Sequence, residues 1–283
     1  MCYTNAMYKI GIVGYGFVGK AVEYGFKEGN EIYIYDKFLP TLSLDEVVNK
    51  SEVIFVGVPT PMSRAYKKID LSIVEDVTAE IVKLCKKNKV EPIVVLKSTI
   101  VPGTTRRLMK ELKYQRMVFN PEFLTEANYL MDFVNADRVV VGADNNEVKQ
   151  WVVDLYRATF PKTPIFETDP TTAEVVKYMA NTYLATKVIF ANEMFDLCEK
   201  LGVNYGEMKK MVVADKRIFD SHLDITTQRG FGGKCFPKDS VALLGLAHEL
   251  GVELSVIETA WKKNLKIRKV RDWEQIEGAV SKK

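Results

Sequence analysis

The sequence has few cysteines and no long apolar run, and each shortage excludes a class of protein. Its cysteines are Cys2, Cys85, Cys198 and Cys235, with no paired spacing. This scatter argues against a disulfide framework and against a zinc site, so we expect free thiols and no metal. No apolar run approaches the roughly 18 residues of a membrane span, and the first residues lack a basic-then-apolar signal pattern. We therefore expect a cytoplasmic protein without a membrane partner.

The sequence also has little net charge. Its 40 basic and 37 acidic residues leave a net charge of +3, which gives no electrostatic reason to expect a nucleic-acid partner. Hydrophobic residues make up 47% of the 283 positions. A chain of this size and composition can bury a large core and has room for roughly two domains.

A glycine-rich turn between two apolar runs is the first positive signal. Gly14, Gly16 and Gly19 follow the run 8–13 and precede a helix-compatible stretch, a second run at 31–35 and then Asp36. This order is the dinucleotide fingerprint, in which the glycines make the turn, clear space for a pyrophosphate and let helix and strand pack closely. An acid about 20 residues later accepts hydrogen bonds from a ribose and repels a 2′-phosphate. The pattern predicts NAD, and a glycine turn without a ligand is the alternative.

Short apolar runs alternate with helical stretches over the first part of the chain. The runs lie at 53–58, 93–97, 117–120, 138–142 and 165–167, a pattern typical of a Rossmann-type doubly wound parallel sheet. Ligands of such sheets gather at the carboxyl ends of the strands, where the sequence places the polar segments 57–61, 97–103 and 120–126. Each segment taken alone could be an ordinary loop. Their shared position at one edge makes them candidates for a site.

The pattern changes to helices near residues 161–170. Thr171 and Glu174 fit a capping box, and a long helix can run from there to Lys200. Lys177 and Asn181 lie four residues apart, so they share a helix face and could donate hydrogen bonds to a developing oxyanion. A solvated lysine beside a polar neighbour is the alternative. We expect residues 1–168 to form an NAD-binding domain and residues 169–283 to form an all-helical domain.

One cysteine has unusual neighbours. Cys235 lies in the segment Gly230–Asp239, between Lys234 and Lys238. Nearby ammonium groups favour a thiolate, and the glycines let the backbone come close to whatever the sulfur attacks. A buried, inert cysteine in a tight turn is the alternative, but flanking charge brings no advantage to a core cysteine. We therefore expect a reactive thiol.

Taken together, these motifs resemble the nucleotide-sugar dehydrogenase family typified by UDP-glucose 6-dehydrogenase and GDP-mannose dehydrogenase. The resemblance runs from Ile10 to about Leu244 and rests on the glycine turn and on the segments 58–61, 98–104, 120–126, 173–181 and 230–239. Family members usually continue into a second αβ domain that holds the nucleotide, whereas this sequence stops after the stretch 261–283. The resemblance therefore implies a short form without the C-terminal UDP-binding domain.

The resemblance also implies a reaction. A nucleotide-sugar primary alcohol would be oxidised to the uronate by two successive hydride transfers to NAD, with Cys235 forming a thiohemiacetal and then a thioester. Lys177 and Asn181 would stabilise the oxyanions, and Asp239 would place a water or a base for the alcohol proton. Glu122 would be the base for thioester hydrolysis. Thr99 would hold the reacting hydroxyl or its water.

The remaining predicted site residues take cofactor and substrate roles by resemblance. The cofactor set is Gly14, Gly16, Phe17, Val18, Gly19, Asp36, Lys37, Pro59, Thr60, Ser98 and Glu126. The substrate set is Phe123, Leu124, Arg217, Gly232 and Lys238. Arg217 resembles an arginine that reaches the sugar-nucleotide site of a neighbouring subunit, although Phe219 replaces the usual glycine; a surface arginine is the alternative. The helical domain is expected to form a homodimer.

Two other functions stay open. A two-electron β-hydroxyacid dehydrogenase of the 6-phosphogluconate or 3-hydroxyisobutyrate kind also places a lysine and an asparagine on one helix, although a single hydride transfer does not require Cys235. A non-catalytic NAD-binding dimeric partner is the third possibility. The sequence does not identify the sugar or the base of the substrate.

Overall fold

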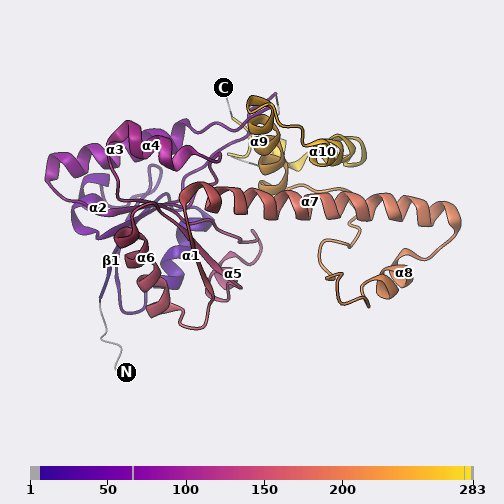
Figure 1. Cartoon of the computed structure of the whole chain (residues 1–283), viewed down its shortest axis with the longest axis horizontal. Helices are drawn as coiled ribbons and strands as arrows, with labels where there is room; N and C mark the ends of the chain where they lie inside the picture. Colours follow the sequence, from indigo (N-terminus) through magenta and orange to yellow (C-terminus); the bar gives the residue numbers. More distant parts are fainter. Residues whose placement is uncertain (1–6, 66, 277, 282–283) are drawn as a thin grey trace. The chain divides into compact units, whose positions relative to one another are not determined.

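The structure is a computed structural model that describes residues 7–65, 67–276 and 278–281 (Figure 1). It contains two compact units. The first comprises the described residues up to Thr60 together with Leu71–Lys177, and the second comprises Pro61–Asp70 together with the described residues from Tyr178 onward. The division falls inside one long helix, α7 (Pro170–Leu201). The domain limits at residues 168 and 169 stay a prediction.

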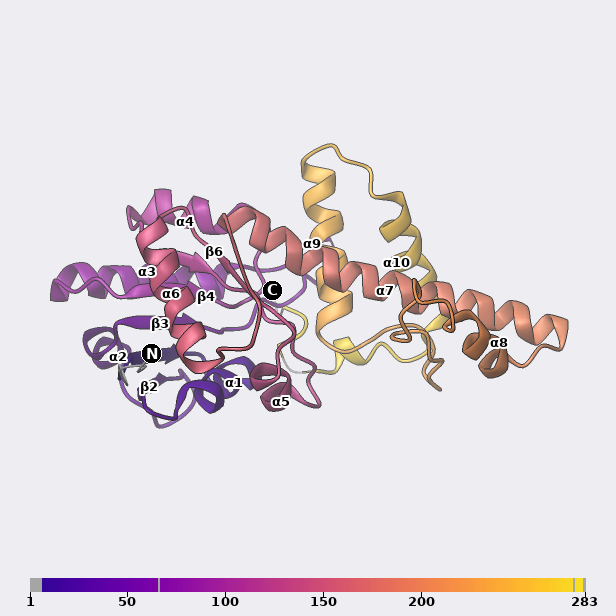
Figure 2. The same cartoon turned by 60° about the horizontal axis from the view of Figure 1, so that its bottom comes forward.

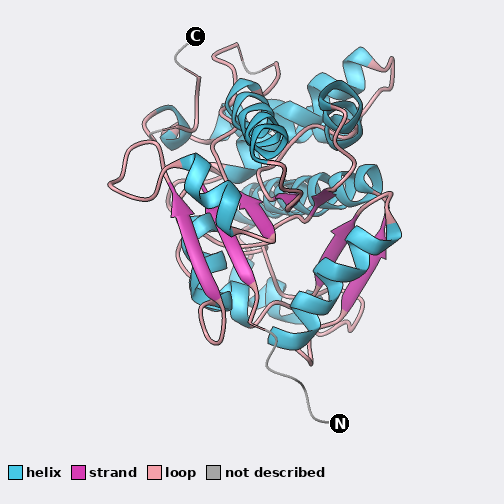
Figure 3. Cartoon of the chain, turned by 90° about the vertical axis from the view of Figure 1, so that its left-hand side faces the viewer, coloured by secondary structure: helices cyan, strands magenta, loops and turns pink. Residues whose placement is uncertain are grey.

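The first unit is built on a seven-stranded sheet with the order β2-β1-β3-β4-β5-β6-β7. Figure 3 separates the strands from the helices by colour. The strands are β1 (Lys9–Val13), β2 (Glu31–Tyr35), β3 (Val53–Val56), β4 (Ile93–Leu96), β5 (Met117–Phe119), β6 (Val139–Gly142) and β7 (Ile165–Thr168). All neighbouring pairs are parallel except β5 and β6, which meet antiparallel at Phe119 and Gly142. This mostly parallel sheet confirms the predicted α/β class.

Helices cover both faces of this sheet (Figure 1). One face packs against α2 (Leu44–Lys50), α3 (Ser72–Asn88) and α4 (Thr104–Leu112), and the other packs against α1 (Phe17–Phe26), α5 (Tyr129–Val134) and α6 (Asn146–Thr159). Because successive side chains of a strand point to opposite faces, Ile54 and Val56 enter the first core while Val53 and Phe55 enter the second. Burial on both faces explains why these strands are continuous apolar runs.

The start of α7 differs from the sequence prediction. The Asp169 carboxylate accepts hydrogen bonds from the backbone N–H groups of Thr171 and Thr172 at 3.0 and 3.2 Å. Asp169 therefore caps the helix, which begins at Pro170. The predicted capping box of Thr171 and Glu174 is wrong, because the Glu174 carboxylate bonds residues of the segment 103–105 instead.

The second unit is helical (Figure 2). It contains the rest of α7, α8 (Tyr205–Val212), α9 (Cys235–Glu249), α10 (Ser255–Ile267) and the 3-10 turn η1 (Asp272–Glu274). Its core includes Ile189, Phe231, Trp261 and Trp273. The segment 61–70 belongs to the same core through Met62, which pairs with Ile69 and Val280 in two isolated bridges. Within the part of the chain that the structure describes, no helix combines the length and the apolar character that crossing a bilayer requires.

Candidate active site

The glycine turn has the local geometry that the fingerprint requires. Gly14 has a φ of +90°, and a Cβ added there would lie 2.7 Å from the Gly57 carbonyl oxygen, so only glycine fits. A Cβ on Gly19 would lie 2.1 Å from the Gly14 carbonyl oxygen, which shows how closely α1 approaches β1. Beside Gly16 no atom lies within 4 Å of the added Cβ. This open space adjoins the amino end of α1, which begins at Phe17, where the fingerprint places a pyrophosphate.

Asp36 follows β2 and ties that strand end to the turn. Its carboxylate accepts hydrogen bonds from the backbone N–H of Tyr15 at 2.8 Å and from that of Phe38 at 2.9 Å. The neighbouring Lys37 is exposed. The acid is thus held at the carboxyl edge of the sheet, where the fingerprint places a ribose.

Two of the predicted cofactor loops are bonded to each other at the same edge. The Ser98 hydroxyl donates to the Val58 carbonyl oxygen at 2.8 Å, which joins the loop after β4 to the loop after β3. Thr60 and Thr99 are buried in these loops. Glu126, the last predicted cofactor residue, is exposed beyond β5.

Glu174 fastens the loop that carries Ser98 and Thr99. Its carboxylate, fully buried, accepts hydrogen bonds from the backbone N–H groups of Gly103 at 2.5 Å and Thr105 at 2.9 Å and from the Thr105 hydroxyl at 2.6 Å. It therefore satisfies free N–H groups at the start of α4. Burial raises the pKa of Glu174, and these hydrogen bonds oppose that rise only in part.

Lys177 and Glu122 form a buried ion pair. The Lys177 ammonium donates to Glu122 Oε1 at 2.9 Å and to the Glu122 carbonyl oxygen at 2.6 Å, and both side chains are less than a tenth exposed. Glu122 Oε2 accepts from the Leu124 N–H at 2.8 Å. The ring of Phe123 lies under the Arg138 guanidinium, 4.0 Å from its centroid. The structure thus brings together four predicted residues from the segment 122–124 and α7.

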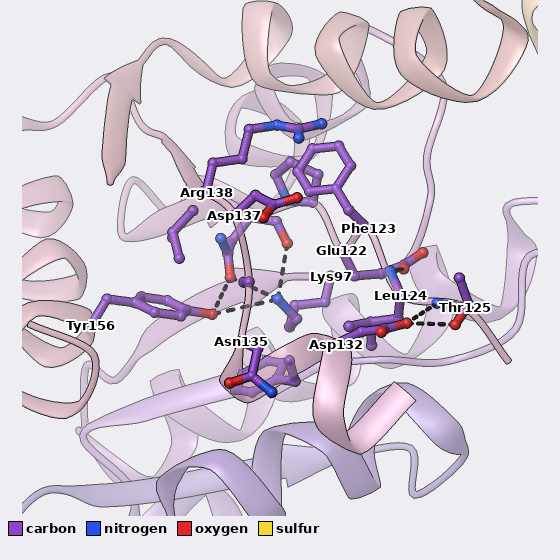
Figure 4. Close-up of a pocket in the computed structure, with 15 residues that line it drawn as sticks. Lys97, Glu122, Phe123, Leu124, Thr125, Asp132, Asn135, Asp137, Arg138 and Tyr156 are labelled. Atoms are coloured by element: carbon purple, nitrogen blue, oxygen red, sulfur yellow. Dashed lines mark hydrogen bonds between the residues drawn. The ribbon is translucent and has the colours of Figure 1, made fainter. Parts of the chain in front are cut away.

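A second buried amine lies close by in the pocket of Figure 4. Lys97, 3% exposed, donates to Asn120 Oδ1 at 2.8 Å and lies 3.5 Å from the Tyr156 hydroxyl oxygen. The pocket has a volume of about 200 Å³, and Glu122 also lines it. Burial lowers the pKa of Lys97 to about 7, the charge of Glu122 raises it and that of Lys177 lowers it further.

In the second unit an amide and a carboxylate form a buried pair. Asn181 Nδ2 donates to Asp239 Oδ2 at 2.5 Å, with the two residues 8% and 0% exposed. Asp239 Oδ1 lies 3.2 Å from the Lys238 ammonium. Cys235 is the first residue of the same helix, α9, and is half-buried. This unit therefore holds a thiol, a carboxylate and an amide donor from two distant segments of the chain.

Gly232 and Arg217 have contacts that the sequence did not predict. A Cβ added to Gly232 would lie 2.3 Å from the Arg268 guanidinium, so an internal contact already explains the glycine. The Arg217 side chain is 88% exposed and pairs with Asp215. Its predicted reach into a neighbouring subunit stays a prediction.

Sequence reasoning missed several residues that hold these groups. Lys97 ends an apolar run, and the sequence analysis includes it only in a polar loop. A lysine at the end of a buried strand nevertheless indicates a buried amine. Glu174 was read as a helix cap. The buried amides Asn192 and Asn264 bond the loop before Cys235, and no local sequence signal marks them.

A Rossmann-type sheet with this glycine turn defines a dinucleotide-binding protein. The chain belongs to the UDP-glucose/GDP-mannose dehydrogenase family, since residues 35–160 match its NAD binding domain and residues 171–266 match its central domain. The predicted family and the predicted cofactor, NAD, are both confirmed.

Individual relatives agree with this membership. The UDP-glucose 6-dehydrogenase of Rickettsia conorii is 35% identical over 221 residues, which are 77% of this chain and 50% of that protein. The enzyme TuaD of Bacillus subtilis is 32% identical over 81% of this chain and 49% of its own length. The chain thus spans about half the length of the curated relatives it matches.

Solved structures show the same fold. A UDP-glucose dehydrogenase from Pyrobaculum islandicum superposes with a TM-score of 0.86 at 28% identity, covering 94% of this chain and 70% of that one. A 3-hydroxyisobutyrate dehydrogenase from Mycobacterium tuberculosis, at 15% identity over 92% of this chain and 93% of that one with a TM-score of 0.72, shares the fold. Similarity at that level carries no information about the reaction.

Proposed function

We propose that the protein oxidises the primary alcohol of a nucleotide sugar to the uronate, with NAD as hydride acceptor, as the name UDP-glucose 6-dehydrogenase describes for its relatives. The observation that carries the proposal is the composition of the second unit, where a helix begins with Cys235 and buries Asp239 against Asn181. A structural cysteine does not require, one turn along its helix, a buried acid that is bonded to a buried amide.

The thiol would trap the aldehyde. Loss of a hydride and a proton from the alcohol gives the aldehyde, and Cys235 Sγ then bonds to its carbon to form a thiohemiacetal. Loss of a second hydride and of the hydroxyl proton leaves a thioester, and water cleaves it to the carboxylate and the free thiol. Bound NAD supplies the acceptor for each hydride. The Asn181 amide would donate to the oxyanion, while Asp239 would hold a water or accept the alcohol proton.

The Lys177 and Glu122 pair would serve the hydrolytic step, and the Lys177 ammonium would also stabilise the oxyanions of the two oxidation steps. A carboxylate fixed by two buried donors is preorganised, so Glu122 could take a proton from the attacking water while the Lys177 ammonium stabilises the oxyanion. Thr99 would hold the reacting hydroxyl or its water. Phe123, Leu124, Gly232 and Lys238 keep the substrate roles that the resemblance implies.

The first unit fits NAD. The space beside Gly16 and the amino end of α1 would take the pyrophosphate, with Phe17 and Val18 in the first turn. Asp36 would accept hydrogen bonds from the adenosine ribose beside Lys37. Pro59, Thr60, Ser98 and Glu126 would lie along the nicotinamide half. The family match does not favour the β-hydroxyacid dehydrogenase.

A homodimer is the assembly we propose, because the second unit leaves a stripe of α7 uncovered. Met179, Tyr183, Phe190 and Leu201 are each at least 60% exposed, and their spacing places them along one face of the helix. An apolar face of this kind is typical of a protein–protein contact. The cytoplasmic location stays a prediction.

The test is to mix the purified protein with NAD and a panel of sugar nucleotides and to follow NADH. We expect two NADH per uronate from one member of the panel, and Cys235→Ser should stop at no more than one NADH with no uronate. Lys177→Ala should slow both oxidation steps. Cys198→Ser, which changes a buried thiol elsewhere in the same unit, is the matched control and should behave as the parent protein.

Two outcomes would reject the proposal. Full uronate formation by Cys235→Ser would eliminate the thioester route. No NADH with any member of the panel, while NAD still binds, would favour the non-catalytic partner.

A further inference from the structure

The loop that leads into Cys235 is bonded by the amide of Asn264 on α10. Asn264 Oδ1 accepts from the Phe231 N–H at 2.8 Å, and Asn264 Nδ2 donates to the Phe231 carbonyl oxygen at 3.0 Å. One side chain thus bonds both the N–H and the carbonyl oxygen of Phe231. In a sheet, a neighbouring strand would bond these two groups. Asn264 is 0% exposed, so loss of this amide would leave two buried backbone groups unpaired.

A second amide, Asn192 on α7, bonds the residues just before. Asn192 Oδ1 accepts from the Gly230 N–H at 3.2 Å and from Arg229 Nε at 2.6 Å. Arg229 has a φ of +56°, a conformation that side-chain-bearing residues adopt at a cost. These bonds hold the loop in that conformation.

The glycines of the loop are explained by contacts within the unit. Gly230 has a φ of +54°, and a Cβ there would lie 2.2 Å from Asn264 Oδ1. A Cβ on Gly232 would lie 2.4 Å from Asp272 Oδ1, and Asp272 Oδ2 accepts from the Gly233 N–H at 3.0 Å. The sequence suggested that these glycines admit a substrate, whereas here their missing side chains admit α10 and η1.

The loop ends where the nucleophile begins. Lys234 is the N-cap of α9 and Cys235 is its first residue. The backbone from Gly230 to Gly233 therefore determines where the first turn of α9 starts and where the sulfur lies. Free N–H groups in the first turn of a helix favour a thiolate, and that advantage is lost if the turn frays.

We propose that Asn264, assisted by Asn192, is a positioning residue that fixes the first turn of α9 and so holds the Cys235 sulfur in its reactive state. The proposal rests on the proposed function only in giving Cys235 the role of nucleophile. The two amides themselves belong to the family's central-domain match at 171–266. A merely structural role would affect the stability of the whole unit and leave the thiol unchanged while the unit stays folded.

The test is alkylation of the full chain with iodoacetamide at about pH 6.5 and about pH 9, with each cysteine followed by peptide mass spectrometry. The rate at the higher pH divided by the rate at the lower pH cancels any change in accessibility that is the same at both pH values. We expect Asn264→Ala to raise this ratio for Cys235 by about fivefold or more, since two hydrogen bonds to the loop are lost. Asn192→Ala and Asn264→Asp should move it in the same direction.

Two buried thiols in the same chain report on unfolding. Cys85 and Cys198 are 1% and 5% exposed, so they should stay unreactive in every variant that keeps its fold. Ile189→Val, which trims the core of the second unit and removes none of the side-chain hydrogen bonds to the loop, is the stability control and should leave the Cys235 ratio unchanged.

The outcomes separate the two proposals. An unchanged ratio in the Asn192 and Asn264 variants that keep Cys198 protected overturns the positioning role, and so does an equal shift in Ile189→Val. If Asn264→Ala exposes Cys198, the result for Asn264→Asp and Asn192→Ala decides. A shifted ratio together with full uronate formation by Cys235→Ser would reject the proposed function and leave the positioning role standing.

Discussion

Among single residues, Lys97 carries an ionisable group in a place where charge is costly. Its amine lies among Asn120, Tyr156 and the pocket beside Glu122. Burial is the largest cause that lowers its pKa to about 7. A methionine would fill the same volume without this cost.

Lys97→Met should therefore change stability in a pH-dependent way. The folded-state pKa lies below the ordinary value of 10.5, so the unfolded chain binds more protons between pH 7 and 10.5 and the parent protein gains stability as the pH rises through that window. The variant lacks this gain. We expect its free energy of unfolding relative to the parent to fall by about 1–2 kcal/mol between about pH 7 and about pH 9, measured by urea unfolding.

Lys83→Met is the matched control, because the Lys83 side chain is 74% exposed. Its difference from the parent protein should be the same at both pH values. If the Lys97 variant also shows a constant difference, the amine is not neutralised by burial.

Asp36→Asn tests the choice of cofactor. Removal of the negative charge removes the repulsion of a 2′-phosphate, while the amide oxygen can still accept from the Tyr15 N–H. We expect the affinity for NADP relative to NAD to rise by about tenfold, measured by calorimetric titration. Asp154→Asn, on the exposed face of α6, should leave the relative affinity unchanged, and an unchanged relative affinity in Asp36→Asn would place the ribose elsewhere.

Sequence reasoning at this scale works for backbone geometry that follows from neighbours in the chain. The three glycines of the turn have the geometry that their spacing predicted. The partners of Lys177 and Asn181 could not be predicted in the same way, because Glu122 and Asp239 lie more than fifty positions away along the chain and reach them only through the fold. The buried amides Asn192 and Asn264 act through backbone bonds, which leave no sequence pattern.

At the scale of elements, the Glu174 side chain of α7 caps the amino end of α4. Glu174→Ala would remove three hydrogen bonds and leave the Gly103 and Thr105 N–H groups without their partner. We expect a loss of about 2–4 kcal/mol in the free energy of unfolding, together with faster amide exchange at 98–105. Urea unfolding and hydrogen exchange measure the two effects.

Glu174→Gln is the control for shape, because it keeps one acceptor oxygen in the same volume. It should lose less stability than the alanine variant. Equal losses in the two variants would mean that packing, and not the hydrogen bonds, accounts for the effect.

The elements themselves could be predicted well where their period is strong. The strands β1, β2, β4 and β6 lie where the apolar runs placed them. The antiparallel pair of β5 and β6 could not be anticipated, because the direction of a strand depends on how the chain returns to the sheet and not on its composition. The start of α7 differs from the prediction because the Asp169 carboxylate accepts from the Thr171 N–H, which the predicted capping box pairs with Glu174.

For the whole molecule, the exposed stripe of α7 predicts self-association. Phe190→Asp places a charge in the middle of this stripe, where Phe190 is 60% exposed. We expect the dimer to dissociate at concentrations where the parent protein is dimeric, because a buried unpaired charge opposes association. Sedimentation velocity over a range of concentrations measures this.

Phe38→Asp is the control, since Phe38 is 87% exposed in the first unit. It should leave the sedimentation coefficient unchanged. A parent protein that stays monomeric at all concentrations would remove the proposed homodimer.

Residues 61–70 belong to the second unit, and this has a consequence for folding during translation. Met62 finds its partners, Ala279 and Ser281, at the far end of the chain. During translation this segment leaves the ribosome long before Ala279 and Ser281 are made, so it cannot form its backbone bonds to them until more than two hundred further residues have been added. Residues 279–281 thus complete a unit whose first segment is made much earlier, and we expect this unit to finish folding only after residues 279–281 have left the ribosome.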